Sequence, residues 1–314
     1  MVIGCAISSK KFDRIMKGPL SELLEKHNIT AQLLDPDVPI QDQGTFSAVL
    51  HKQLGNAKFE ALLREYHGMH PAVPIIDPID RIAPLSSRDN MLAAVGADGI
   101  EVESSSGEKR RVHSPPQAVI KDLSSFEDVL KQMAQHGVEF PALVKPLSTI
   151  VEDKHDIYAV KNEEQLKQLS EGELCRKSGV VQHFIDHGEK LHKVYIIGDK
   201  VVEDVRLSLP DRADWRDNQI ATGVTVDDPL SRVSAFDPSV QDSLNGEDDH
   251  LDPALRDSLA TELRERLQLN LFNFDLIQHA SGSMYIVDIN YFPGLSKVPG
   301  YEHLFVEYLV EACS

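Results

Sequence analysis

Acidic side chains occur within two apolar segments near the C-terminus, at positions that suit metal binding. If the dipeptide Ser281-Gly282 forms the turn of a hairpin, Asp275 lies directly opposite Asp288. Two carboxylates in that relation repel each other, because their Cβ atoms are about 4.5–5.5 Å apart. A bound cation would remove the repulsion, and carboxylate oxygens are ligands that Mg²⁺ takes in proteins. The spacing therefore predicts a magnesium site on this hairpin.

The same register places Asn273 opposite Asn290, on the same face as the two aspartates. We expect the other face to lie in the core, and it carries Phe272, Phe274, Leu276, Val287 and Ile289. The alternative is a solvated polar sheet face, but these segments are more apolar than surface strands usually are.

Three weaker signals lie earlier in the chain and suit a nucleotide. Lys145 ends an apolar strand, where its ammonium group can reach phosphates. Gln182 and His183 interrupt another apolar strand, whose backbone can bind an adenine edge. Lys193 and Arg206 lie on the hairpin that follows. The segment with Gln182 and His183 is equally compatible with an ordinary half-buried strand. Lysine and arginine side chains in the positions of Lys145, Lys193 and Arg206 are more often solvated than bound to a ligand.

A basic cluster near the N-terminus indicates either an anion site or a set of ordinary exposed lysines. Ser8-Ser9-Lys10-Lys11 follows the first predicted strand, and His51-Lys52 ends the third. Open α/β sheets bind ligands at the carboxyl ends of their strands. The sequence contains no G-x-G-x-x-G, G-x-x-x-x-G-K-[ST] or G-x-S-x-G motif, and no zinc-binding spacing, which disfavours Rossmann, P-loop and α/β-hydrolase chemistry.

Composition excludes several classes of protein. The 314 residues carry a net charge of −18, which argues against a nucleic-acid or anionic-membrane binder. Three cysteines are too few for a disulfide framework, and no segment is apolar enough for a membrane span. The N-terminal residues lack the pattern of a signal peptide. We expect a monomeric cytoplasmic protein that could also enter the nucleus.

The elements that position these residues predict an α/β fold. Alternating signals at the N-terminus predict a small, mostly parallel sheet, with strands at 2–8, 29–34, 46–52 and 73–76 and helices at 19–27 and 56–66. Later helices are expected at 86–95, 124–136, 162–169, 253–267 and 301–312. Later strands are expected at 141–147, 156–160, 179–185, 191–197, 200–207, 271–278 and 283–290. Residues 103–118 are expected to be a connection, and the acidic stretch 209–257 a long loop or insertion.

The order of these features resembles the ATP-grasp superfamily. More closely, the chain resembles the inositol 1,3,4-trisphosphate 5/6-kinase (inositol-tetrakisphosphate 1-kinase) family, especially its plant-like branch. The most specific matching motifs are Leu50-His51-Lys52 and Asp288-Ile289-Asn290-Tyr291-Phe292-Pro293-Gly294. Further matches are Ser8-Ser9-Lys10-Lys11, Arg88 with Met91-Leu92, Ser114-Pro115-Pro116, Val144-Lys145-Pro146, His155, Val180-Val181-Gln182, Lys193-Val194-Tyr195, Ser208-Leu209-Pro210-Asp211 and Leu271-Phe272-Asn273-Phe274-Asp275.

The resemblance implies three parts and a kinase activity. An N-terminal α/β domain at 1–88 would bind an inositol phosphate, and two ATP-grasp subdomains at 89–186 and 187–314 would bind ATP and the metal. The γ-phosphoryl group of Mg-ATP would pass to a hydroxyl of an inositol tris- or tetrakisphosphate, with Mg²⁺ as the cofactor.

The resemblance also assigns roles to individual residues. ATP would be bound by Arg88, Lys145, Val181, Gln182, His183, Phe184, Lys193 and Ser208. The inositol phosphate would be bound by Lys11, Lys52, His155, Lys193, Asn290 and Gly294. The metal would be bound by Asp275, Asp288 and Asn290, and the catalytic residues would be Lys193, Asp288 and Asn290.

One position departs from the family and keeps other functions open. Val151 stands where family members carry a glycine, and Glu152 and Asp153 add negative charge beside it. A β-branched residue blocks the close approach of a ligand to the backbone, so we expect the 147–154 loop to set substrate choice. The alternatives are an ATP-grasp carboxylate–amine ligase, or a protein that binds inositol phosphates or nucleotides without catalysis.

Overall fold

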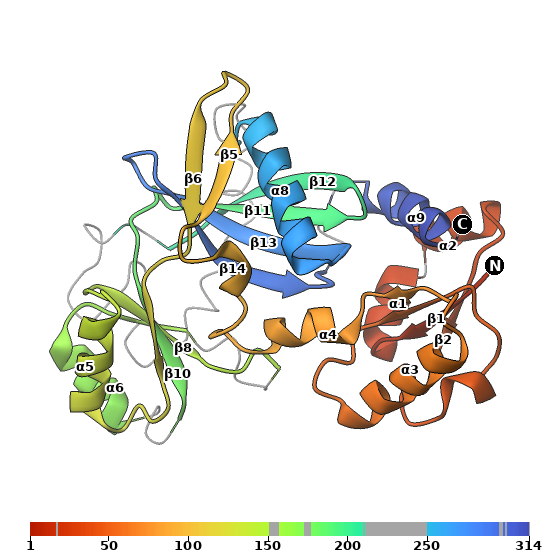
Figure 1. Cartoon of the computed structure of the whole chain (residues 1–314), viewed down its shortest axis with the longest axis horizontal. Helices are drawn as coiled ribbons and strands as arrows, with labels where there is room; N and C mark the ends of the chain where they lie inside the picture. Colours follow the sequence, from red (N-terminus) through yellow and green to blue (C-terminus); the bar gives the residue numbers. More distant parts are fainter. Residues whose placement is uncertain are drawn as a thin grey trace.

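The computed structural model describes residues 1–16, 18–150, 157–172, 177–209, 211, 250–294, 298 and 300–313. Within them the chain forms an α/β fold with three sheets (Figure 1). The predicted acidic loop at 209–257 lies mostly outside this part of the chain. Among the residues that the structure describes, no helix has the length and apolar character of a membrane span.

The N-terminal sheet is parallel, as the alternating pattern predicted. Its strand order is β2-β1-β3-β4, with β1 at Val2–Ala6, β2 at Thr30–Leu33, β3 at Ala48–His51 and β4 at Ile75–Ile76. The helices are α1 (Ser9–Met16), α2 (Pro19–Lys26), α3 (Ala57–Met69) and the short α4 (Ile79–Ile82). Asn56 caps α3 by accepting a hydrogen bond from the Phe59 backbone N–H, as expected from its type.

The central sheet is antiparallel and encloses a core of its own. Its order is β7-β10-β8-β9, with β7 at Gln117–Ile120, β8 at Ala142–Pro146, β9 at Tyr158–Val160 and β10 at Gly179–His183. Helices α5 (Phe126–Gln135) and α6 (Glu163–Glu171) lie together against this sheet (Figure 1).

The third sheet has six strands and carries the predicted metal hairpin. Its order is β12-β11-β13-β14-β6-β5, with β5 at Ile100–Glu103, β6 at Lys109–His113, β11 at Lys190–Ile197, β12 at Lys200–Leu207, β13 at Leu271–Gln278 and β14 at Met284–Tyr291. Helix α8 (Pro253–Leu267) covers one face, and α9 (Tyr301–Ala312) lies beside α2 (Figure 1). One hydrophobic core therefore joins the N-terminal and C-terminal sheets.

Two predicted elements are wrong. The expected helix at 86–95 is replaced by two 3₁₀ turns, Ala83–Ser86 and Ala93–Val95, because the Arg88 backbone N–H donates to the Leu147 carbonyl instead. The expected connection at 103–118 contains β6 and the start of β7. The strand β6 was overlooked because it is polar and has only one buried residue, Val112.

Candidate active site

The predicted register of the hairpin is confirmed at both polar pairs. Asp275 pairs with Asp288, and Asn273 with Asn290. The predicted two-residue turn is wrong, since Gln278 pairs with Met284 and Gly282 takes a left-handed φ of 88° in a wider turn. A bulge beyond Asp275 compensates for the one-residue difference. That bulge makes Val287 the extra residue, so it is half-buried rather than in the core.

Charged residues form a row across four strands on this face of the sheet. The cross-strand pairs run from Asp204 on β12 to Lys193 on β11, then to Asp275 and Asp288. The Lys193 ammonium group donates to both Asp275 carboxylate oxygens, at 2.6 and 2.9 Å. Burial raises the pKa of Asp275, Lys193 lowers it and Asp288 raises it, and the net direction is upward. Burial and the neighbouring Asp288 charge together therefore outweigh the cations near Asp275.

The oxygen donors of the hairpin fit a hard divalent cation. The Asn273 Nδ2 group donates to Asp275 at 2.8 Å, and the Asn290 Nδ2 group donates to Asp288 at 2.7 Å. The buried Asn273 Oδ1 atom finds no hydrogen-bond partner among the described residues. In that part of the chain, no three His, Cys, Asp or Glu side chains group into a metal site. Any cation would therefore be held by two carboxylates with amide oxygens, a set that suits Mg²⁺.

Lys145 on β8 and Arg88, which donates to the end of β8, both interact with Asp288 of this hairpin. The Lys145 ammonium group donates to Gln182 Oε1 at 2.7 Å, and Arg88 donates from Nη1 to the Pro146 carbonyl at 2.8 Å. Burial lowers the pKa of Lys145 to about 8, while the Asp288 carboxylate opposes that shift. The same two causes act on Arg88, whose pKa is also lowered. Both cations thus share the electrostatic field of Asp288.

The strand that was predicted to bind adenine already uses part of its hydrogen-bonding groups within the protein. Val181 is fully buried in the core of the central sheet. The backbone N–H groups of His183 and Phe184 already donate to the carbonyls of Pro116 and Pro141. An adenine edge would therefore need other donors than these two N–H groups.

Ser208 lies where the chain leaves β12, against the segment that joins β10 to β11. The His187 Nδ1 atom lies 2.7 Å from the Ile185 carbonyl, which can only accept, so Nδ1 carries the proton. The Ser208 hydroxyl then donates to His187 Nε2 at 2.7 Å. Asp211 accepts from the backbone N–H groups of His187 and Gly188, which fixes this segment.

The N-terminal lysines meet the end of the hairpin. Lys11 and Lys52 donate to the Phe292 carbonyl at 2.6 and 2.9 Å, and Lys52 also donates to the Tyr291 carbonyl at 2.9 Å. The Lys11 ammonium group lies 3.6 Å from the centroid of the Phe292 ring. Burial, with Lys52 and Arg14 adding to it, lowers the pKa of Lys11 to about 5. Two crowded lysines in this position would gain from a bound anion.

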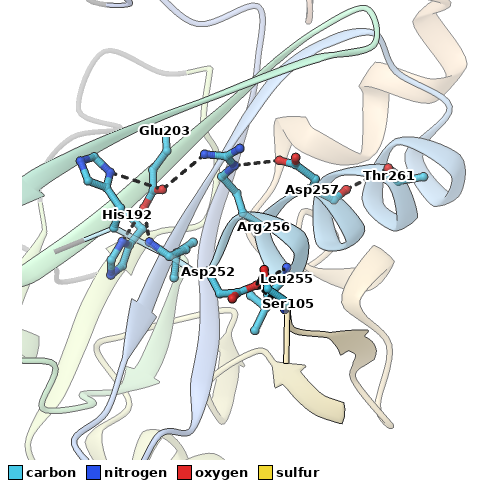
Figure 2. A network of polar contacts seen from close by, with 10 residues as sticks. Ser105, His192, Glu203, Asp252, Leu255, Arg256, Asp257 and Thr261 are labelled. Atoms are coloured by element: carbon cyan, nitrogen blue, oxygen red, sulfur yellow. Dashed lines mark hydrogen bonds and ion pairs between the residues drawn. The ribbon is translucent and has the colours of Figure 1, made fainter. Parts of the chain in front are cut away.

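The reverse face of the same sheet carries a separate polar network (Figure 2). Glu203 accepts from His192 Nδ1 at 2.8 Å and from the Leu251 backbone N–H at 3.0 Å. Asp252 caps α8 and also accepts from Ser105. These contacts hold α8 against the sheet, on the side away from Lys193.

The structure brings most of the predicted site residues to one region. Gly294 is exposed just beyond Phe292, whereas His155 and Val151 lie outside the described residues. The sequence interpretation missed Tyr195, whose hydroxyl accepts from Arg206 at 2.8 Å. Strand alternation from Lys193 could have placed Tyr195 on the same face. The buried Asp77 was also missed, because it directly follows the strand predicted at 73–76 and belongs to no motif.

Comparison with known proteins identifies the chain's relatives. The model of the inositol 1,3,4-trisphosphate 5/6-kinase ATP-grasp domain matches residues 106–311, and that of its pre-ATP-grasp domain matches residues 2–82. Inositol-tetrakisphosphate 1-kinase 3 of Arabidopsis thaliana is 36% identical over 99% of this chain and 84% of its own length. Inositol-tetrakisphosphate 1-kinase 2 of Oryza sativa subsp. indica is 34% identical over 99% and 85%.

Solved structures agree on the fold. The crystal structure of D-cycloserine synthetase DcsG superposes with a TM-score of 0.63 over 100% of both chains, at 15% sequence identity. A RimK-domain ATP-grasp protein from Sphaerobacter thermophilus gives a TM-score of 0.56, covering 99% of this chain and 100% of its own, at 15% identity. The fold is an ATP-grasp fold preceded by a small parallel α/β domain. The chain belongs to the inositol 1,3,4-trisphosphate 5/6-kinase family.

Proposed function

We propose that this protein is a Mg²⁺- and ATP-dependent inositol polyphosphate kinase that phosphorylates a hydroxyl of an inositol tris- or tetrakisphosphate. The observation that carries the proposal is the meeting of Lys11 and Lys52 with the end of the hairpin that bears Asp275 and Asp288. That meeting supports an anion site beside the candidate metal site. Both are needed when a phosphorylated alcohol accepts a phosphoryl group from Mg-ATP.

The residues divide into three proposed roles. Asp275, Asp288 and Asn290 would hold Mg²⁺, which when bound neutralises charge on the triphosphate. Arg88, Lys145, Lys193 and Ser208 would hold ATP, with adenine near the strand Val181–Phe184. The inositol phosphate would contact Lys11, Lys52, His155, Lys193, Asn290 and Gly294. Since phosphoryl transfer needs little covalent help, Lys193 would act by neutralising charge, and Asp288 and Asn290 would act by positioning the metal.

The three sheets suggest which part of the chain binds each substrate. We propose that residues 1–88 bind the inositol phosphate, while 89–186 and 187–314 hold ATP between them. Strands β5 and β6 lie within the range 89–186, but they belong to the six-stranded sheet, where β6 pairs with β14. We further propose a monomer, and neither nucleic acid nor a membrane as partner.

The competing functions differ in their acceptor. A carboxylate–amine ligase would release ADP when given a carboxylic acid and an amine, and hydroxylamine would trap its acyl phosphate. We expect ADP release to depend on an inositol phosphate and no acyl hydroxamate to form. A binding protein without catalysis would release no ADP under either condition. Hydroxamate formation without inositol phosphate turnover would contradict the proposed kinase.

We expect Lys52→Ala and Lys11→Ala each to raise KM for the inositol phosphate by about tenfold, because each removes a hydrogen-bond donor to a phosphate group. A bound phosphate would raise the lowered pKa of Lys11 again, so that Lys11 would bind it as an ammonium group. The KM for ATP should change less than about twofold, since both lysines belong to the N-terminal anion site. Steady-state kinetics with each substrate varied in turn would measure this. Lys10→Ala is the matched control, because Lys10 is exposed and adjacent to Lys11. A raised KM for ATP with an unchanged KM for the inositol phosphate would contradict the two-site layout.

We expect ATP binding to weaken as pH rises through about 8, the pKa to which burial lowers Lys145. Below that pH the ammonium group is charged and attracts the phosphates, and above it the free enzyme has lost that charge. Bound triphosphate should raise the pKa again, so ATP binding should take up a proton at a pH just above that value. Calorimetry in buffers of different ionisation enthalpy would measure the uptake. Lys145→Gln should abolish it, and equal uptake in both proteins would place Lys145 away from the phosphates.

A further inference from the structure

Asp77 is a buried carboxylate that connects the N-terminal domain to the metal hairpin. It follows β4 and is only 1% exposed. Its Oδ2 atom accepts from the backbone N–H groups of Asn270 and Leu271, both at 2.9 Å, and its Oδ1 atom accepts from Asn270 Nδ2 at 3.0 Å. All three donors stand at the start of β13, the strand that carries Asp275.

A contact with Arg264 determines which end of the Asn270 amide faces Asp77. The Asn270 Oδ1 atom accepts from Arg264 of α8, from Nε at 3.3 Å and from Nη2 at 3.1 Å. The Asn270 amide therefore cannot rotate without turning its Nδ2 group toward the guanidinium. Asp77 thus faces a side chain that can only donate to it.

The backbone of Asp77 reaches the other strand of the hairpin and the base of the lysine pair. Its N–H group donates to the Tyr291 hydroxyl at 2.6 Å, and Tyr291 ends β14. Its carbonyl lies 2.7 Å from Nε2 of His51, the residue before Lys52. Burial lowers the pKa of His51 to about 4, so at neutral pH its single ring proton lies on Nε2 and donates to that carbonyl. One residue thus contacts both hairpin strands and the strand end that carries Lys52.

We propose that Asp77 is a positioning residue that sets the distance between the Lys11–Lys52 pair and the Asp275–Asp288 pair. It thereby places the acceptor hydroxyl, rather than water, at the γ-phosphorus. The inference rests on the proposed kinase function. In transfer, the hydroxyl oxygen bonds to phosphorus, the bond to ADP breaks and the hydroxyl proton is released. In hydrolysis, water replaces the hydroxyl, and ADP, inorganic phosphate and a proton leave.

The test measures the ratio of inorganic phosphate to phosphorylated inositol formed in one reaction. A loss of folded enzyme lowers both products equally, so a merely structural role leaves this ratio unchanged. A displacement of about 1 Å can cost on the order of a hundredfold in rate, so a misplaced acceptor should lower transfer more than hydrolysis. We expect Asp77→Asn to raise the ratio at least about fivefold, because the introduced amide would direct its NH₂ group against the Nδ2 group of Asn270.

The chain offers an exchange that restores the contact. In the double variant Asp77→Asn with Asn270→Asp, the new amide donates to the new carboxylate, whose other oxygen still accepts from Arg264. The amide oxygen at position 77 takes over the two backbone N–H groups. Asn270→Asp alone places a second carboxylate opposite that of Asp77. It should therefore also raise the ratio of inorganic phosphate to phosphorylated inositol. We expect the double variant to return within about twofold of the wild-type ratio, as a coupled pair should.

Asp80→Asn is the matched control, because it removes the same charge from the same domain at a side chain that is 74% exposed. It should keep the wild-type ratio. Wild-type ratios in both single variants, or a double variant no better than the worse single one, would overturn the inference while leaving the kinase function standing. A wild type that phosphorylates no inositol phosphate would overturn the proposed function, and the inference with it.

Discussion

We expect Asp288→Asn to lower kcat on the order of a thousandfold while leaving the fold intact. Asp288 stands opposite Asp275 and is a proposed ligand of Mg²⁺. Without metal, the substitution removes one of two opposed like charges, so the metal-free melting temperature should hold or rise. The wild type should gain stability when Mg²⁺ is added, and the variant should lose most of that gain.

The measurement combines turnover with thermal unfolding at several Mg²⁺ concentrations. Asp199→Asn is a suitable control, because Asp199 lies on the β11–β12 turn with its side chain 58% exposed. A clear loss of metal-free stability together with retained activity would show that Asp288 has a structural role and not a metal-binding one.

Lys193→Met should impair both activity and stability. The Lys193 side chain is 16% exposed. Burial acts to lower its pKa, but Asp275, Asp288 and Tyr195 together outweigh burial and the net direction is upward. Removing one partner of a buried ion pair costs about 3–5 kcal/mol, because the other charge is left without compensation. We therefore expect a large loss of unfolding free energy in the metal-free variant and a fall in kcat of at least about a hundredfold.

Mg²⁺ should recover part of the lost stability, since a cation at Asp275 would replace the missing ammonium charge. The increase in melting temperature on adding Mg²⁺ should therefore be larger for Lys193→Met than for the wild type. Lys200→Met provides the control on the same hairpin, where the ion pair with Asp199 is exposed and screened by solvent. Equal Mg²⁺ responses in the variant and the wild type would separate Lys193 from the metal site.

Local patterns predicted the elements that depend on nearby residues. Helices α8 and α9 begin and end where the sequence predicted, because capping and apolar spacing act over a few residues. The opposed aspartates were also predicted, although for an incomplete reason. The wider turn and the bulge at Val287 each shift the register by one residue and cancel before Asp275.

Contacts between distant segments could not be predicted in the same way. Helix α1 was missed because its residues Ser9, Lys10 and Lys11 suggested a ligand loop. The meeting of Lys52 with Phe292 joins residues 240 positions apart. Asp77 could not be recognised from the sequence, because only the folded chain brings Asn270 to it. Periodicity carries no information about such pairs, whereas the family resemblance placed Lys11 and Lys52 at a substrate site.

The measurement that tests the central claim most directly is transfer of labelled phosphate. The purified chain would be incubated with γ-³²P-ATP, Mg²⁺ and a panel of inositol tris- and tetrakisphosphates, with Asp288→Asn in parallel, and the products would be separated by isomer. We predict label in a more highly phosphorylated inositol with the wild type and none above background with the variant. Label confined to inorganic phosphate, or equal inositol labelling by both proteins, would contradict the assignment of this site as an inositol phosphate kinase centre.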